Sequence, residues 1–243
     1  MKRKIRRFTD IAMSINLLLL MSCRNADMRL HECLGVTMLV LVCCHIFLNR
    51  FWYSALFKGS YGTHRKILTF IDLSLMICFF MTAFCGMSMS TFLFPFMNGF
   101  LPLSAAERLC SGFSCWLVVF AGLHLGMHIT AILSRFKLRY ATKRDLKAFF
   151  TAAAAYGFTA FIRNRFYECL FFRSPFTYDG KSIWVLLEEW ILIFLFFAFL
   201  AEEISSLTIL LPNKKDRKKD IAYTALCIAL AIIVGISIAQ AMN

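Results

Sequence analysis

The stretch HECLGVTMLVLVCCHIFLNRFWY, residues 31–53, decides how the rest of the chain is interpreted. Its middle is apolar enough for a helix in a membrane, and a histidine lies toward each end of that helix. His31 and His45 are fourteen residues apart. In a helix this spacing places them about 21 Å apart along the axis and within about 40° of the same face. Two imidazoles on one face, toward opposite membrane surfaces, indicate haem ligands.

The composition of the whole chain indicates a membrane protein. Of its 243 residues, 60% are hydrophobic and 27 are phenylalanine, which is unusual for a soluble domain. The formal net charge of +13 comes from short basic runs between apolar segments and not from one basic surface, so we expect no nucleic-acid partner. The prediction is an all-α, polytopic helix bundle in a lipid bilayer, with a four-helix haem-binding core.

Apolar segments and basic runs alternate along the chain. We expect six or seven membrane spans, at residues 8–22, 30–48, 67–92, 109–133, 183–200 and 221–242, with 148–162 either a tilted further span or an interfacial helix. The basic runs fit a cytoplasmic N-terminus, because positive charge collects on the cytoplasmic side. The expected location is a bacterial cytoplasmic (inner) membrane. The alternative for residues 8–22 is a lipoprotein signal that ends at Cys23.

The ten cysteines form no metal or redox motif. Most of them lie inside apolar segments, where a thiol packs as a small hydrophobic group. The chain has no CxxC, no CxxCH and no Cys/His spacing typical of zinc. We therefore expect few or no disulfides, no covalently attached haem and no structural zinc.

Four of the five histidines lie in two spans that run in the same direction. Measured from the arginine at the outer end of each span, Arg29 or Arg108, His45 and His124 are both sixteen residues inward. This spacing predicts one depth, at which two neutral imidazoles from facing helices can ligate a haem iron. Measured from the arginines at the inner ends, His128 matches His45 better than His124 does. The sequence therefore allows either His124 or His128 as the second ligand beside His45.

Other residues in these spans have alternative interpretations. Gly35 and Gly126 lie near the histidines, and glycines there would let a porphyrin edge approach the helix backbone. Intramembrane histidines also hydrogen-bond between helices without any cofactor, and for His31 interfacial anchoring is an equal alternative. His64 lies in a basic cytoplasmic segment, so we expect it to be solvated.

Several short motifs, taken in order, resemble the flavinylation-associated cytochromes. They are HECLG at 31–35, HIFLNRFW at 45–52, FKGSY at 57–61, GMSMS at 86–90 with FP at 94–95, HLGMH at 124–128, FIRNRF at 161–166 and FRSPF at 172–176. The resemblance covers roughly residues 8–207. It implies a membrane cytochrome b-like helical bundle over residues 1–207, which leaves residues 208–243 as a basic loop and an additional C-terminal transmembrane helix.

The resemblance also implies cofactors and partners. Such cytochromes are associated with extracytoplasmic proteins that carry covalent flavin, so this chain would carry electrons between a quinone or cytoplasmic donor and that flavoprotein. His45 and His124 would hold an inner haem b. The family pattern has a further histidine at the outer end of the second of these spans, where this chain has Cys110. An outer haem would then need His31 with a Cys110 thiolate, and loss of that haem is the alternative.

The chain has no catalytic motif of its own, so we expect an electron-transfer subunit and leave open whether it counts as an enzyme. Two other functions fit the same residues. One is a haem-free transporter or channel, in which the histidines with Glu188 and Glu189 line a polar pathway. The other is a scaffold subunit of a redox complex that has lost its own cofactors.

Overall fold

The computed structural model describes residues 2–23, 27–59, 62–133, 140–173 and 180–210, and this part of the chain contains helices and no strands. The predicted all-α class is therefore confirmed. The helices are α1 Lys2–Cys23, α2 Met28–Leu48, α3 Arg50–Ala55, α4 Thr63–Ser88, the 3-10 helix η1 Pro95–Met97, α5 Leu103–Leu133, α6 Tyr140–Arg163, α7 Phe166–Leu170 and α8 Ile183–Leu210.

Within the described residues, four helices are long and apolar enough to cross a membrane. They are α2, α4, α5 over Leu103–Ile129 and α8 over Ile183–Ser206. Four of the expected spans are thus confirmed as helices of membrane-spanning length. The segments 8–22 and 148–162 lie in α1 and α6, which begin with basic residues, and their spanning stays a prediction. The expected span at 221–242 lies outside the described residues.

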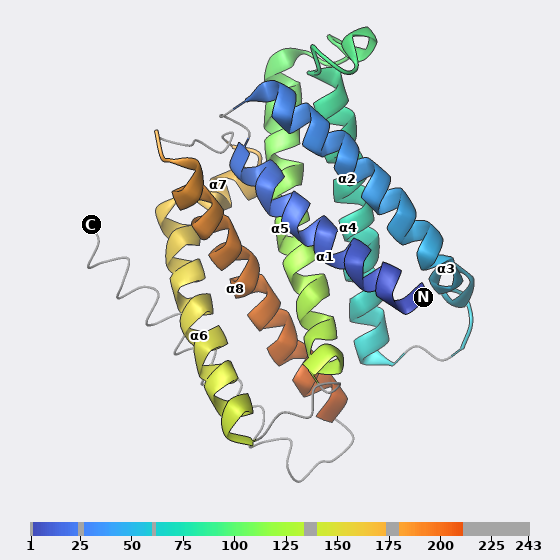
Figure 1. Cartoon of the computed structure of the whole chain (residues 1–243), viewed down its shortest axis with the longest axis vertical. Coiled ribbons are helices and arrows are strands. Elements are labelled where there is room, and N and C mark those ends of the chain that lie inside the picture. The colour runs from blue at the N-terminus through green and yellow to red at the C-terminus, as the bar shows by residue number, and fades with distance from the viewer. Residues whose placement is uncertain (1, 24–26, 60–61, 134–139, 174–179, 211–243) are drawn as a thin grey trace.

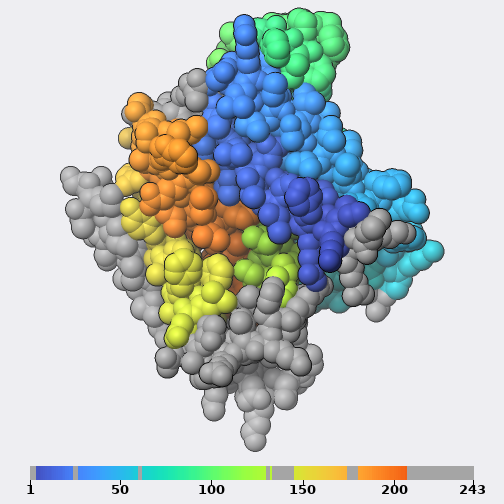
Figure 2. Space-filling model, viewed as in Figure 1, coloured from blue at the N-terminus to red at the C-terminus, as the bar shows by residue number. Residues whose placement is uncertain are grey.

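The helices form a layer with a hairpin laid across it. In the layer, α6, α8, α5 and α4 follow one another side by side, and α1 and α2 cover one face of it (Figure 1). Figure 2 shows the same hairpin, in blue, covering the upper right part of that face. α1 and α2 are antiparallel, because Arg6 donates a hydrogen bond to Leu48 O at 2.6 Å and Asn16 donates one to Leu34 O at 3.0 Å.

Close helix packing on both sides of α8 depends on glycines. A Cβ atom at Gly126 of α5 would clash with the carbonyl oxygen of Ala198. A Cβ atom at Gly157 of α6 would clash with the carbonyl oxygen of Leu192. The absence of side chains at these two positions therefore allows the backbones of α5 and α6 to approach α8 closely.

The end of α4 differs from the sequence prediction. The helix ends at Ser88 and not near residue 92, because the following segment folds back onto α2. There the Glu32 carboxylate accepts hydrogen bonds from Ser90 Oγ at 2.7 Å, from Leu93 N at 2.8 Å and from Thr91 N at 3.1 Å. A single side chain of α2 thus fixes the loop between α4 and α5.

Candidate functional site

Two histidine–aspartate pairs lie in the bundle, one in each of two neighbouring hairpins. In the first hairpin, His45 Nδ1 on α2 lies 2.8 Å from Asp10 Oδ1 on α1. In the second, His124 Nδ1 on α5 lies 2.6 Å from Asp72 Oδ1 on α4. In both hairpins the first helix supplies the acid and the second helix supplies the histidine. The two sites are therefore built in the same way.

These contacts define the tautomer of each imidazole. An ionised carboxylate can only accept hydrogen bonds, so Nδ1 of His45 and of His124 carries the proton and donates it. Nε2 of a neutral ring then has its lone pair available as an acceptor or a ligand. Asn49 Nδ2, a donor, lies 3.4 Å from His45 Nε2, which agrees with this assignment. A carboxylate on one ring nitrogen is the usual arrangement behind a histidine that binds a metal through the other.

Both imidazoles are only partly covered by the protein. The side chains of His45 and His124 keep 31% and 32% of their surface exposed, whereas the Asp72 side chain keeps 15%. A histidine that only joins two helices in a core would be enclosed. The exposure therefore leaves both rings accessible to a further group.

His128 lies one helical turn beyond His124 on α5. The two rings make an edge-to-face contact, with centroids 4.8 Å apart. His128 is also within electrostatic range of Asp72, His64 and Asp10, which belong to α4 and α1. It is thus close to both histidine–aspartate pairs, but Asp72 orients His124 directly. The structure therefore brings His124 and His128 together, with Asp10 of the other pair within electrostatic range of His128.

His64 is only partly exposed and has a side-chain partner, whereas the sequence analysis expected it to be solvated. It belongs to the first turn of α4, is half-buried and has Nε2 3.2 Å from Ser205 Oγ on α8. The prediction was wrong because a basic segment was assumed to be a loop, whereas the helix begins at Thr63.

Tyr53 of α3 is influenced by Asp72, the partner of His124. Burial and the charge of Asp72 raise the pKa of the Tyr53 phenol.

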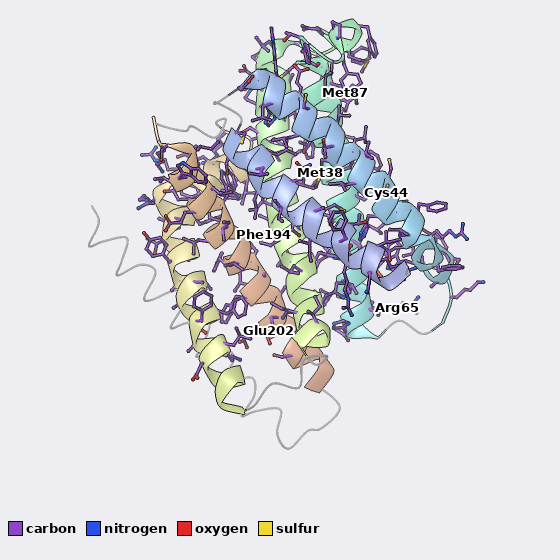
Figure 3. All side chains as sticks on the ribbon, viewed as in Figure 1. Met38, Cys44, Arg65, Met87, Phe194 and Glu202 are labelled. Atoms are coloured by element: carbon purple, nitrogen blue, oxygen red, sulfur yellow. The ribbon has the colours of Figure 1, made fainter. Side chains whose placement is uncertain are left out.

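His31 and Cys110 are separated from the other histidines by an apolar cluster. His31 and Cys110 are both half-buried near the beginnings of α2 and α5. Between their level and the inner histidines, one apolar cluster joins α1, α2, α4, α5 and α8. Figure 3 labels two of its members, Met38 and Phe194; others are Leu17, Met21, Cys78, Phe79, Cys115 and Val118.

The two glycines proposed to accommodate a porphyrin differ. A Cβ atom at Gly35 would meet no heavy atom within 4 Å, so the surface of α2 is open there. Gly126 instead faces α8, whose Ala198 carbonyl and Ala201 side chain fill the space beside it. The interpretation of Gly126 as room for a porphyrin edge is therefore corrected: its small size serves helix packing.

Two of the four acidic residues of α8, Glu189 and Glu203, are engaged in ion pairs. Glu189 is buried and pairs with Arg163 and with Lys181 at 3.1 Å, and Asn164 Nδ2 donates to it at 2.9 Å. Glu203 is buried and lies 2.8 Å from Lys147 Nζ of α6. These contacts stabilise the packing of α6 on α8.

Asp10 and Asp72 are functional candidates that the sequence analysis did not single out. The available signal was the position of Asp72, an ionisable residue in the middle of an apolar segment, where charge is costly and usually has a function. Its pairing with His124 joins residues 52 positions apart and depends on how α4 and α5 are rotated. That rotation is set by the tertiary packing of the helices, so the local sequence does not reveal it.

The donors in this region are two imidazoles, each with a carboxylate at Nδ1. Within the described ranges, no three His, Cys, Asp or Glu side chains are grouped so that they could hold an ion together. Haem needs only two axial protein ligands, and two imidazoles with carboxylate-bound Nδ1 atoms supply that chemistry. Comparison with protein-family models, with curated proteins and with solved structures finds no match to this chain.

Proposed function

We propose that this protein is a membrane b-type cytochrome that carries electrons between a quinone or cytoplasmic donor and an extracytoplasmic flavoprotein. The observation that carries the proposal is the repeated histidine–aspartate pair, one on each of two neighbouring hairpins. The resemblance of the motifs to flavinylation-associated cytochromes supports the same function. The six or seven spans, the cytoplasmic N-terminus and the bacterial inner membrane are part of this proposal.

His45 and His124 would hold one haem b. Each would bind through Nε2, because Nδ1 is held by Asp10 or Asp72. The bound haem would supply reversible one-electron transfer. The two carboxylates would fix the rotation of the rings and strengthen their donor character. We choose His124 over His128 because His124 has the carboxylate partner that His45 also has.

The helices around these residues would set the environment of the cofactor. α1 and α4 hold the two aspartates, and α5 is fixed against α8 by the close approach at Gly126. The outer apolar cluster separates this region from His31 and Cys110. We therefore propose one haem in the inner half and no second haem at the outer end.

The test is the haem content of the purified full-length protein expressed with ample haem supply. We expect a b-type α band in the dithionite-reduced minus oxidised spectrum and one haem per chain by the pyridine haemochromogen method. Two haems per chain would instead indicate a second haem, at the outer site with His31. Absence of haem would refute the proposal and favour the haem-free transporter or the scaffold subunit.

A further inference from the structure

The short helix α7 is attached to α5 by a dense set of contacts. Trp116 Nε1 on α5 donates a hydrogen bond to Leu170 O at 2.9 Å. The ring of Phe172, just after α7, packs edge-to-face on Phe113 with centroids 5.2 Å apart, over the space that Gly112 leaves open. Phe166, at the beginning of α7, is fully buried. α7 is thus held in a defined position on one face of α5.

Two cysteines lie at the centre of this contact. The Sγ atoms of Cys115 on α5 and Cys169 on α7 are 2.6 Å apart, and both residues are completely buried. Ser111 Oγ lies 3.2 Å from Cys169 Sγ. A disulfide bond has an S–S length of about 2.05 Å, so a shift of roughly half an ångström would bring the two sulfur atoms to bonding distance.

We propose that Cys115 and Cys169 form a disulfide that fastens α7 to α5. One disulfide is compatible with the expectation of few or no disulfides, and no CxxC motif could reveal this pair because the two cysteines are 54 positions apart. The bond would be a permanent part of the folded protein, since neither sulfur atom is accessible to solvent after α7 has packed on α5.

The local backbone explains why a covalent link is useful here. α7 has five residues, too few for a helix that is stable by itself. The residues that flank it, Arg165 and Phe172, have φ angles of 48° and 55°, a left-handed conformation that is unfavourable for residues other than glycine. The segment therefore depends on its contacts with α5, and a bond between Cys115 and Cys169 would hold it there.

The reaction is a thiol–disulfide exchange. The two cysteine thiols would give up two electrons and two protons to the disulfide of an extracytoplasmic thiol oxidoreductase, which becomes a dithiol, while one S–S bond forms between Cys115 and Cys169. The exchange would take place before α7 packs, while both thiols can reach the enzyme. This inference rests on the proposed orientation, which places α7 outside the cytoplasm, and is independent of haem.

The test counts reactive cysteines by mass. Cells are lysed directly into denaturant with excess N-ethylmaleimide, and the full-length protein is isolated without reductant. The chain has ten cysteines, so one disulfide leaves 10 − 2 = 8 adducts. Peptide mapping should then find the segment with Cys115 joined to the segment with Cys169. Ten adducts on the wild-type chain would refute the proposal.

Two variants identify the pair. Cys115→Ala removes one partner, so all nine remaining cysteines should react. Cys44→Ala removes an exposed cysteine of α2 and should give 9 − 2 = 7 adducts, because the pair is intact. Seven adducts for Cys115→Ala would mean that a different pair is bonded and would also refute the proposal.

A separate measurement distinguishes a wrong orientation from a wrong pair. Asn98→Cys places a thiol in the exposed loop between α4 and α5, which precedes the half of α5 on which α7 packs. A membrane-impermeant maleimide should label it in intact cells whose outer barrier has been opened. If it is labelled and the wild-type chain still gives ten adducts, the orientation stands and the disulfide fails. If it is not labelled, the proposed orientation fails.

Discussion

Asp72→Asn is the substitution that tests most specifically how the proposed haem site is built. The Asp72 carboxylate lies 2.6 Å from His124 Nδ1, and only 15% of the Asp72 side-chain surface is exposed. Asparagine keeps the size and one acceptor oxygen but removes the negative charge. His124 would therefore remain in place as a weaker ligand, and the bundle would keep its packing.

The expected size of the effect follows from this geometry. Loss of a partner that supports a metal-binding histidine typically costs 10- to 100-fold in affinity, or about 1.4 to 2.7 kcal/mol. A charge-assisted hydrogen bond contributes about 1.5 to 3 kcal/mol, which is the same range. We also expect a more positive midpoint potential, because a carboxylate on Nδ1 strengthens the imidazole donor and favours ferric iron.

The assay is transfer of haem from detergent-solubilised protein to an excess of a haem-accepting apoprotein, together with a redox titration. The matched control is Asp27→Asn at the beginning of α2, where the side chain accepts from Arg29 N and asparagine is an equally good N-cap. Faster haem loss and a raised potential are expected for Asp72→Asn alone. Wild-type values for both variants would refute the role assigned to Asp72.

Two further predictions concern stability, measured as thermal unfolding of the detergent-solubilised protein. Gly126→Ala should destabilise it by about 1 to 3 kcal/mol through overpacking against Ala198, whereas Gly35→Ala, whose Cβ meets no neighbour, should be neutral or stabilising by up to about 1 kcal/mol; equal effects would contradict the packing of α5 on α8. Glu189→Gln should cost about 3 to 5 kcal/mol, because it leaves two cations beside a buried site without a counter-charge. The control Glu168→Gln breaks a surface pair and should change stability by less than about 1 kcal/mol; a loss below that value for Glu189→Gln would show that its ion pairs do not hold α6 on α8.

The sequence was sufficient to predict four helices of membrane-spanning length. Apolar segments of membrane-spanning length follow from composition alone, and α2, α4, α5 and α8 are found where they were expected. The equal offsets of His45 and His124 reflect two helices that run in the same direction. A local pattern can carry this information because the depth of a residue in a helix depends only on its position along that helix.

The partners of these histidines could not be predicted in the same way. His45 and Asp10 are 35 residues apart, and their contact depends on the rotation of α1 against α2. Gly126 was misinterpreted for a related reason: a glycine permits close approach, but the sequence does not tell which neighbour approaches. α7 and the cysteine pair depend on long-range packing between segments whose local patterns are weak.

The haem content of a matched set of histidine variants tests the central claim most directly. The wild-type protein should contain one haem per chain, His45→Ala and His124→Ala should contain none, and His64→Ala and His128→Ala should keep one. Size-exclusion profiles and melting temperatures would show that each variant is folded. A folded His45→Ala variant that still contains one haem per chain would contradict the account.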